Sequence, residues 1–295
     1  MAAPRVLVIY KKSVFRTHVE ERRHSRVKEL LEAASPAVRR VVRAHRHHTQ
    51  TLERVRRALT RLGARASFRF RRDVGDTSGF DLVVTVGGDG TLLWVSHYVA
   101  KTPVLSVNSA PNDSVGFFAG ATRQNVEERL ELAVRGELPV TSLQRMAVKL
   151  DGELLETRVL NDVLLCHENP AAMSRYILRH GRLVEDQKSS GIWVGPAAGS
   201  TAAQRSAGGR VLSPISRMIQ YVVREPYEPS GRPYRLKKGL VQPGQRFSMT
   251  SKMHEARLYA DGPYRAHRVQ IGQEVSMVLS PEPLDLLGFS RADSW

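Results

Sequence analysis

The sequence predicts an α/β lobe followed by a β-rich lobe, and three observations support this prediction. The chain has 295 residues, close to the roughly 250–300 residues at which a single hydrophobic core stops growing. Up to residue 139, continuous apolar runs alternate with helical patterns, which is typical of βαβ units. Beyond Pro139, polar and apolar residues alternate, as in antiparallel strands. We therefore expect domains at residues 1–139 and 140–280, and a tail at 281–295 that could return to the first lobe.

The composition indicates a folded protein that attracts anions. Hydrophobic residues make up 41% of the chain and charged residues 25%, close to the averages of globular proteins. The net charge of +16 would attract nucleic acid and polyphosphate-bearing small molecules alike. The single cysteine, Cys166, excludes an intrachain disulfide and a cysteine-rich zinc site and suits a reducing compartment. We expect Cys166 to be a buried strand residue.

The N-terminal residues show no targeting pattern. Met1–Arg5 leads directly into the apolar run Val6–Tyr10, which is too short for the core of a signal peptide. No apolar stretch approaches the length that spans a bilayer. The sequence therefore predicts a cytoplasmic protein without a membrane partner.

The first lobe is expected to contain a βαβ unit. Val6–Tyr10 is a continuous, partly β-branched apolar run, as in strands covered on both faces. A helix is predicted where apolar residues recur at helical spacing before Gly63, at Leu52, Val55, Leu59 and Leu62. Strands are then predicted at Leu82–Val86 and Pro103–Val107, with a helix at Leu92–Val99 between them.

Two local features of this lobe lead to further expectations. The run His45–His48 has no cysteine or carboxylate at metal-ligand spacing, and the neighbouring arginines repel cations. It is therefore expected to be solvated helix or loop. Thr122 is predicted to cap the helix Val126–Val134, which should end just before Gly136.

The second lobe shows strand patterns separated by turn residues. The dipeptides Asp151–Gly152 and His180–Gly181 are typical of turns. The predicted strands are Met146–Leu150, Thr157–Leu160, Arg246–Thr250, Ala256–Ala260 and Val275–Leu279.

A glycine-rich turn, Gly87–Thr91, is the first candidate for chemistry. Its backbone N–H groups are exposed between a strand and a helix start, which suits phosphate. A carboxylate inside such a turn, Asp89, repels phosphate unless it binds a metal ion or takes a proton from an attacking hydroxyl. The alternative is an ordinary turn in which Asp89 caps the following helix. The glycine spacing matches neither the Walker nor the dinucleotide-binding pattern.

A second run, Ser189–Gly209, is dense in glycine, alanine, serine and threonine. Such a run lets backbone approach a ligand closely and leaves hydroxyls free to bond it. Ile192–Val194 is predicted to be a strand and Ser200–Ser206 a short capped helix. The alternative is a flexible loop.

Taken in order, the motifs resemble those of the NAD kinase family. They are Gly87–Thr91, Asn108 with Gly116–Phe118, Asn161–Asp162, Gly199–Ala202 and Ser206–Gly209. They span about half of the chain, which is more specific than any single motif. Ala197–Ala203 followed by Arg224–Pro226 most resembles the plant-type NADH kinase branch.

The resemblance implies a fold and a reaction. The fold is a Rossmann-like α/β N-terminal lobe and a β-sandwich-like C-terminal lobe, with the dinucleotide bound between them and usually a homodimer or homotetramer. The reaction is phosphorylation of the adenosine ribose 2′-hydroxyl of NADH or NAD by ATP with Mg²⁺. Asp89 would be the catalytic base, and Gly88 and Gly90 would offer backbone donors to phosphate.

The resemblance also implies which residues bind the dinucleotide, and it implies no protein ligand for a metal. Asn161 and Asp162 would hold the adenosine half, and Phe117 would pack at the adenine side. The full set of expected binding residues is Gly88, Gly90, Thr91, Asn108, Phe117, Asn161, Asp162, Lys188, Ser190, Thr201, Ala202 and Ser206.

The sequence departs from the family pattern in three places. Ser190 replaces a common aspartate, Ala203 replaces a common tyrosine, and Ser109–Asp113 follows Asn108 where two glycines are common. An acidic neighbour would attract the positively charged ring of NAD, and serine offers no such attraction. NADH is therefore the expected substrate.

Two other functions are compatible with parts of the sequence. Lipid kinases of the diacylglycerol or sphingosine type share the Gly-Gly-Asp-Gly turn, but Asn161–Asp162 and Ser206–Gly209 favour the dinucleotide enzyme. A nucleic-acid-binding protein would fit the net charge and the arginine-rich segment Arg16–Arg72. That segment has few aromatics for stacking and no zinc-finger pattern, so nucleic acid is an unlikely partner.

Overall fold

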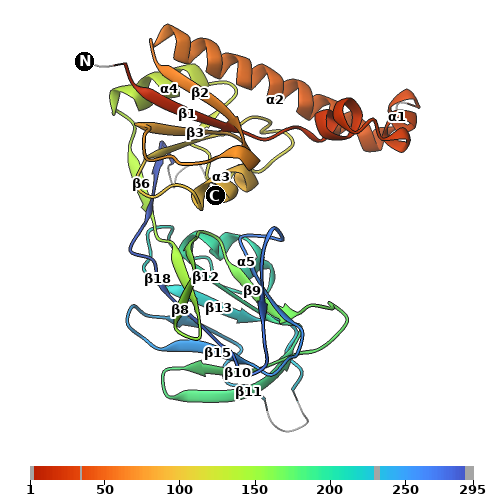
Figure 1. Cartoon of the computed structure of the whole chain (residues 1–295), viewed down its shortest axis with the longest axis vertical. Coiled ribbons are helices and arrows are strands. Elements are labelled where there is room, and N and C mark those ends of the chain that lie inside the picture. The colour runs from red at the N-terminus through yellow and green to blue at the C-terminus, as the bar shows by residue number, and fades with distance from the viewer. Residues whose placement is uncertain (1–2, 34, 229–232, 290–295) are drawn as a thin grey trace. The chain divides into compact units, whose positions relative to one another are not determined.

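A computed structural model describes residues 3–33, 35–228 and 233–289 (Figure 1). The chain divides into two compact units. Residues 1–141 and 284–295 form the first, here called the α/β unit, and residues 142–283 form the second, the β unit. The predicted fold class, an α/β lobe followed by a β-rich lobe, is confirmed. Among the described residues, no helix is both long and apolar enough to cross a bilayer.

The α/β unit is built on a seven-stranded sheet with the order β2-β1-β3-β4-β19-β6, and β5 pairs with β4. Strands β1 to β4 are parallel to their neighbours, and β19 is parallel to β4. The strands are β1 (Arg5–Tyr10), β2 (Arg65–Phe70), β3 (Leu82–Gly87), β4 (Val104–Asn108), β5 (Ala121–Thr122), β6 (Val140–Leu143) and β19 (Leu284–Leu287). The strand order reverses direction between β1 and β3. In open α/β sheets, ligands bind outside the carboxyl ends of the strands at such a point.

Helices cover both faces of this sheet (Figure 1). Helices α2 and α4 lie on one face and α3 on the other, and α1 continues beyond the sheet at the start of α2. The helical elements are η1 (Arg16–Glu21), α1 (Ser25–Glu32), α2 (Pro36–Arg61), η2 (Arg71–Asp73), α3 (Asp89–Ser96) and α4 (Val126–Arg135). The predicted apolar stripe of α2 packs on the sheet, with Val55 and Leu59 fully buried. Gly63, at φ +64°, follows its end as predicted.

The predicted cap of α4 is wrong. Asn125, not Thr122, occupies the N-cap position, and Thr122 lies in β5. The Asn125 side-chain oxygen accepts a hydrogen bond from the Thr122 backbone N–H at 2.8 Å, so it closes the loop before the helix. Gly136 ends the helix in the left-handed conformation, as predicted.

The β unit contains two six-stranded sheets, ordered β11-β10-β15-β18-β7-β8 and β14-β13-β12-β9-β16-β17. Residues of both sheets form one hydrophobic core, and the strand pairs within each sheet are antiparallel. The elements are β7 (Met146–Leu150), β8 (Glu153–Val159), β9 (Val163–His167), β10 (Ser174–His180), β11 (Leu183–Ser189), β12 (Ile192–Pro196), η3 (Ala197–Thr201), α5 (Ala203–Ser206), β13 (Ile219–Val223), β14 (Lys238–Val241), β15 (Phe247–Ser251), β16 (Ala256–Ala260), β17 (Arg265–Val269) and β18 (Glu274–Leu279).

Two expectations for this unit need correction. Cys166 lies in strand β9 but is only half-buried, because its side chain lies beside Gly191, which covers it with backbone alone. Burial nevertheless raises the pKa of its thiol. The helix expected at Ser200–Ser206 is two short pieces, η3 and α5, because Ala202 between them has a non-helical ψ of −133°.

Candidate active site

The carboxyl ends of β1, β3 and β4 bring three segments together in the α/β unit. Lys11 follows β1, Gly88 follows β3 and Ser109 follows β4. The Lys11 backbone N–H donates to the Val86 carbonyl at 3.4 Å, and the Ser109 backbone N–H donates to the Gly87 carbonyl at 2.9 Å. The glycine turn is therefore held between its two neighbours in the sheet.

The three glycines of the turn have different environments. A Cβ on Gly87 would overlap the Thr91 hydroxyl, and a Cβ on Gly88 would overlap the Ser114 hydroxyl. Gly90 faces open space and is exposed. It lies in the first turn of α3, where backbone N–H groups lack an acceptor within the helix. Gly87 and Gly88 thus pack closely against neighbouring side chains, whereas Gly90 leaves backbone accessible to a ligand.

The Asp89 carboxylate is held by the loop that follows β4. One oxygen accepts a hydrogen bond from the Phe117 backbone N–H at 2.9 Å, and the other accepts from Phe118 at 3.1 Å. Gly88, not Asp89, occupies the N-cap position of α3, so the alternative that Asp89 caps its own helix is wrong. Each carboxylate oxygen retains a second lone pair for a further hydrogen bond.

Asn108 supports the loop that presents those two amides. Its side chain is buried, donates to the Ser114 carbonyl at 3.0 Å and accepts from the Ala110 backbone N–H at 3.2 Å. Asp113 in the same loop forms an ion pair with Arg43 of α2 at 2.6 Å. The Asn108 amide is therefore engaged within the protein, and it acts on Asp89 through the position of the loop.

Thr91 and Phe117 differ in accessibility. The Thr91 side chain is 1% exposed and lies beneath the turn, where its hydroxyl has no hydrogen-bond partner among the described residues. Phe117 is half-buried and packs against Phe118 and Phe289, with ring centroids 5.0 and 5.9 Å away. Phe117 is thus partly accessible to a ligand, whereas Thr91 supports the turn from below.

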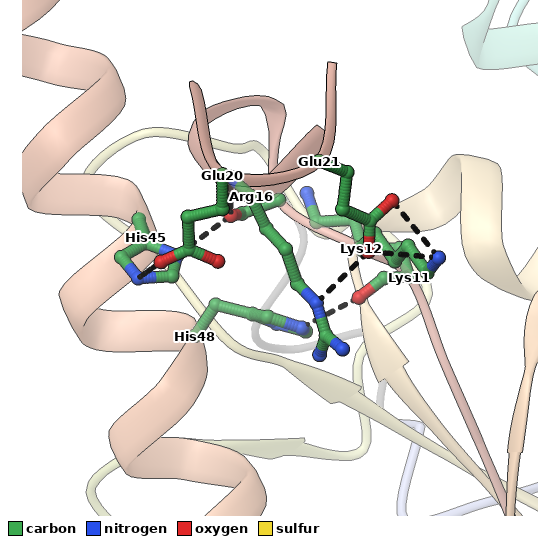
Figure 2. Close-up of polar contacts among 8 residues, drawn as sticks. Lys11, Lys12, Arg16, Glu20, Glu21, His45 and His48 are labelled. Carbon is green, nitrogen blue, oxygen red and sulfur yellow. Dashed lines mark hydrogen bonds and ion pairs between the residues drawn. The ribbon is translucent and has the colours of Figure 1, made fainter. Parts of the chain in front are cut away.

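A polar network connects this edge to helix α2 (Figure 2). One ring nitrogen of His48 contacts the Lys11 carbonyl at 2.7 Å, and the other contacts the Ser109 hydroxyl at 2.9 Å. His48 thereby joins the segments on either side of the glycine turn. It is 4% exposed, so the expectation that His45–His48 is solvated is wrong for this residue. Burial, and secondarily the charge of Lys11, lowers the pKa of His48 to about 4.

Lys11 places a cation at the same edge. Burial, and secondarily the charge of Arg71, lowers the pKa of its ammonium group. Its neighbour Lys12 instead pairs with Glu21, which also binds Arg16 (Figure 2). Among the described residues, no carboxylate lies within ion-pair distance of the Lys11 ammonium. The edge therefore carries a partly desolvated positive charge.

In the β unit, Asn161 and Asp162 lie in a backbone loop tied to Asp261. The backbone N–H groups of Leu160, Asn161 and Asp162 donate to the Asp261 carboxylate at 2.8, 2.7 and 3.1 Å. The Asn161 side-chain oxygen is buried and has no hydrogen-bond partner among the described residues. Such an orphaned acceptor costs free energy unless a ligand donor satisfies it.

Two glycines pack directly on this loop. A Cβ on either Gly195 or Gly199 would overlap the Asn161 carbonyl oxygen. These glycines therefore serve contact between two backbones, whereas the sequence suggested that they serve contact with a ligand. The packing fixes Asn161 against the start of η3.

Asp162 is a buried carboxyl group. Its side chain is 6% exposed, and burial, followed by the charge of Asp261, raises its pKa to about 7. The group is therefore largely protonated below neutral pH, and it can then donate as well as accept a hydrogen bond.

Of the remaining predicted residues, Ser206 lines a hollow of the β unit. The hollow measures about 540 Å³ and is lined by Trp193, Ala203, Ser206, Ala207, Val223, Arg224 and Glu225. Thr201 and Ala202 directly precede Ala203 in the chain. Ser190 and Lys188 are not among the lining residues: Ser190 donates its N–H to the Arg224 carbonyl at 3.0 Å, and Lys188 is exposed on β11.

Comparison with known proteins identifies the family. The chain is 37% identical over 219 residues to a protein described as probable NADH kinase from Oryza sativa subsp. japonica, and the match covers 67% of each chain. This chain belongs to the NAD kinase family. Residues 7–138 match the family pattern described as ATP-NAD kinase N-terminal domain. An NADH kinase from Arabidopsis thaliana is 34% identical over 228 residues, covering 67% of this chain and 69% of the relative.

Solved structures of NAD kinases share the fold. An NAD kinase from Archaeoglobus fulgidus in complex with ATP has a TM-score of 0.67 at 21% identity, covering 96% of this chain and 92% of its own. Yeast NADH kinase complexed with NADH has a TM-score of 0.68 at 16% identity, covering 100% and 86%. The NAD kinase assignment makes this protein a kinase and confirms the resemblance to the NADH kinase branch. The lipid-kinase and nucleic-acid alternatives are set aside.

Sequence reasoning missed several residues of this NAD kinase that the structure brings to the two sites. His48 falls in the helical phase of Leu52, Val55 and Leu59, a signal that could have marked it as buried. Lys11 follows the first strand directly, a position that faces the ligand side of a parallel sheet. Nothing in the local sequence indicates that Asp261 holds a loop about 100 residues earlier.

Proposed function

We propose that this kinase transfers the γ-phosphoryl group of ATP to the 2′-hydroxyl of the adenosine ribose of NADH, in preference to NAD. The observation that carries the proposal is the Asp89 carboxylate. It is held by two backbone N–H groups beside an accessible glycine turn. Family membership supports the reaction, and the sequence of this chain supports the preferred substrate.

Asp89 is proposed as the general base. Its two amide hydrogen bonds fix the carboxylate and leave lone pairs that can accept the proton of the 2′-hydroxyl. The 2′-oxygen then forms a bond to the γ-phosphorus while the bond from that phosphorus to the β–γ bridging oxygen breaks. The products are the phosphorylated dinucleotide and ADP, and the proton remains on Asp89.

The phosphate groups are proposed to bind at the carboxyl edge of β1 and β3. The Gly90 backbone is accessible there, and the partly buried Lys11 ammonium offers a cation without a carboxylate partner among the described residues. A desolvated cation interacts more strongly with phosphate than a fully hydrated one does. The Rossmann-like residues 1–139 would thus supply the phosphate site, and residues 140–280 the dinucleotide site.

We propose Mg²⁺ as the metal that accompanies ATP. Within the described residues, no group of three or more histidine, cysteine, aspartate or glutamate side chains is placed to hold a metal ion. Mg²⁺ usually keeps several waters and binds to substrate phosphates without a dedicated cage of protein ligands. The ion would neutralise charge on the β- and γ-phosphates.

In the β unit, the adenosine half is proposed to contact Asn161 and Asp162. The unsatisfied side-chain oxygen of Asn161 suits a donor on the nucleoside, such as a hydroxyl or an exocyclic amine. Thr201 and Ala202 are proposed to line the same region, because Gly199 packs their segment directly on the Asn161 backbone. Lys188 and Ser190 remain proposed contacts at the outer end of the dinucleotide.

The proposal extends to assembly and location, which the family resemblance supports. We expect a homodimer or homotetramer in the cytoplasm. Sedimentation of the purified protein would determine its mass, and fluorescence microscopy of the tagged full-length chain would determine its location.

The test is a coupled assay of the purified protein with Mg-ATP and either NADH or NAD. We expect NADPH to form with a higher kcat/KM than NADP. Asp89→Asn keeps one of the two acceptors for the Phe117 and Phe118 amides, so we expect some loss of thermal stability. It should still bind nucleotide, but turnover should fall by about 10²–10⁴-fold, the usual contribution of a general base. Near-normal turnover of Asp89→Asn would remove this residue from the chemistry.

A further inference from the structure

The hollow of the β unit is lined by one aromatic residue beside several small ones. Trp193 is among the lining residues, and so are the small residues Ala203 and Ala207. At about 540 Å³, the hollow is within the range of small-molecule pockets, roughly 300–1,000 Å³. A planar ring stacked on an indole is the ligand group that such a lining favours.

Arg224 supplies a positive charge in this lining. Its guanidinium carbon lies 5.9 Å from the centroid of the Trp193 ring, and the side chain is half-buried. Among the described residues, no carboxylate lies within ion-pair distance of it. A cation in this setting is poorly screened, so its field reaches a ring bound beside Trp193.

The backbone places Arg224 next to the position where the family pattern commonly has an aspartate. The Arg224 N–H donates to the Gly191 carbonyl at 2.8 Å, and the Ser190 N–H donates to the Arg224 carbonyl at 3.0 Å. A carboxylate at residue 190 would therefore lie close to this cation. Because serine is uncharged, residue 190 does not neutralise the positive charge of Arg224.

Among the described lining residues, Glu225 is the only acidic one, and it is exposed. Water screens an exposed carboxylate more than a half-buried guanidinium. An exposed charge is therefore expected to weaken the field of Arg224 without reversing it.

We propose that this hollow binds the nicotinamide ring, with Trp193 stacking on it and Arg224 selecting the reduced form. The inference rests on the proposed function and names the residues that set its redox specificity. The reduced ring is neutral, whereas the oxidised ring is a cation that Arg224 repels. A tryptophan ring by itself attracts a cation. Arg224 therefore reverses the preference that the tryptophan alone would produce.

The test compares kcat/KM for NADH and NAD in charge variants of Arg224. Arg224→Gln should lower the NADH-to-NAD ratio by roughly tenfold, the effect of one unit charge a few ångströms away in a partly dry site. Arg224→Lys should keep most of the wild-type ratio. Glu225→Gln should shift the ratio toward NADH. The matched control is Arg205→Gln, because Arg205 lies on α5 but does not line the hollow; its ratio should match the wild type.

A binding measurement tests the stacking independently of turnover. Reduced nicotinamide mononucleotide should quench tryptophan fluorescence in the wild type and in Trp94→Phe, and the quenching should be largely lost in Trp193→Phe. Equal quenching in Trp193→Phe, or displacement of the probe by AMP, would place another group in the hollow and overturn the inference.

The kinetic outcomes separate the two proposals. If the wild type phosphorylates neither dinucleotide, the proposed function fails. If it phosphorylates NADH or NAD but Arg224→Gln leaves the ratio unchanged, the proposed function stands and the inference about Arg224 is wrong.

Discussion

The two units hold their candidate sites by different means. In the α/β unit, side chains of one long helix hold the loops around the glycine turn, through His48 and the Arg43–Asp113 ion pair. In the β unit, backbone packs directly on backbone at Gly195 and Gly199. The first arrangement leaves a glycine open to a ligand, whereas the second uses its glycines for packing. The comparison teaches that a glycine in such a segment either stays accessible to a ligand or packs against backbone, depending on the residues that it faces.

The units also differ in the protonation state that burial favours. Asp162 in the β unit favours its protonated form, and His48 in the α/β unit favours its unprotonated form. Both forms are neutral, as desolvation requires. The pH dependence of the two residues therefore has opposite signs.

The largest expected effect is the loss of stability that Asp162 causes as pH rises. Its pKa is about 7 in the folded protein and about 3.9 in the unfolded chain. Between these values the unfolded chain releases a proton that the folded protein retains, so stability falls as pH increases. The fall amounts to about 4 kcal/mol between pH 4 and 7. Asp162→Asn should remove it in urea titrations across this range, and an unchanged pH dependence would contradict the raised pKa.

The opposite dependence is expected from His48. Its pKa is about 4 in the folded protein and about 6.5 in the unfolded chain. As pH falls from 6.5 to 4 the unfolded chain binds a proton that the folded protein does not, which removes about 3 kcal/mol of stability. His48→Gln should flatten this acid limb, although it loses part of the hydrogen bonding to Lys11 and Ser109. Calorimetry of the wild type, Asp162→Asn and His48→Gln at several pH values would separate the loss of stability at low pH from the loss at rising pH. The same loss at low pH in the wild type and in His48→Gln would show that His48 is not responsible.

A smaller effect distinguishes the glycines themselves. Gly199→Ala places a Cβ against the Asn161 carbonyl, and overpacking of this kind costs about 1–3 kcal/mol. Gly90→Ala meets nothing within 4 Å, so its thermal stability should be close to that of the wild type. Its kinase activity should fall, because the added methyl group would occupy the space in which phosphate is proposed to approach the backbone. Equal stability of the two variants would mean that the β-unit loop can move away from Gly199.

The sequence predicted the strands better than the contacts between them. Buried apolar runs such as Val6–Tyr10 and Leu82–Val86 have strand patterns that need no knowledge of the fold. The glycine turn and Asp89 could likewise be recognised from a few consecutive residues. What holds them could not be predicted, because the amides that bind Asp89 are 28 and 29 residues away. His48 was misjudged because its arginine-rich neighbours suggested solvent, although its place on the apolar stripe of α2 decides its burial.

Strand β19 gives the chain an unusual order of completion. It pairs with β4 through Leu286 and Val104, so the α/β sheet needs residues from both ends of the sequence. On the ribosome, residues 142–283 emerge before β19 does. All strands of the β unit are therefore synthesised while the sheet of the α/β unit still has an open edge beside β4. The N-terminal domain usually folds first during synthesis. Here, one strand of the N-terminal sheet is synthesised after the whole β unit. A chain truncated just before residue 284 would therefore keep every strand of the β unit but leave the α/β sheet without the strand that pairs with β4.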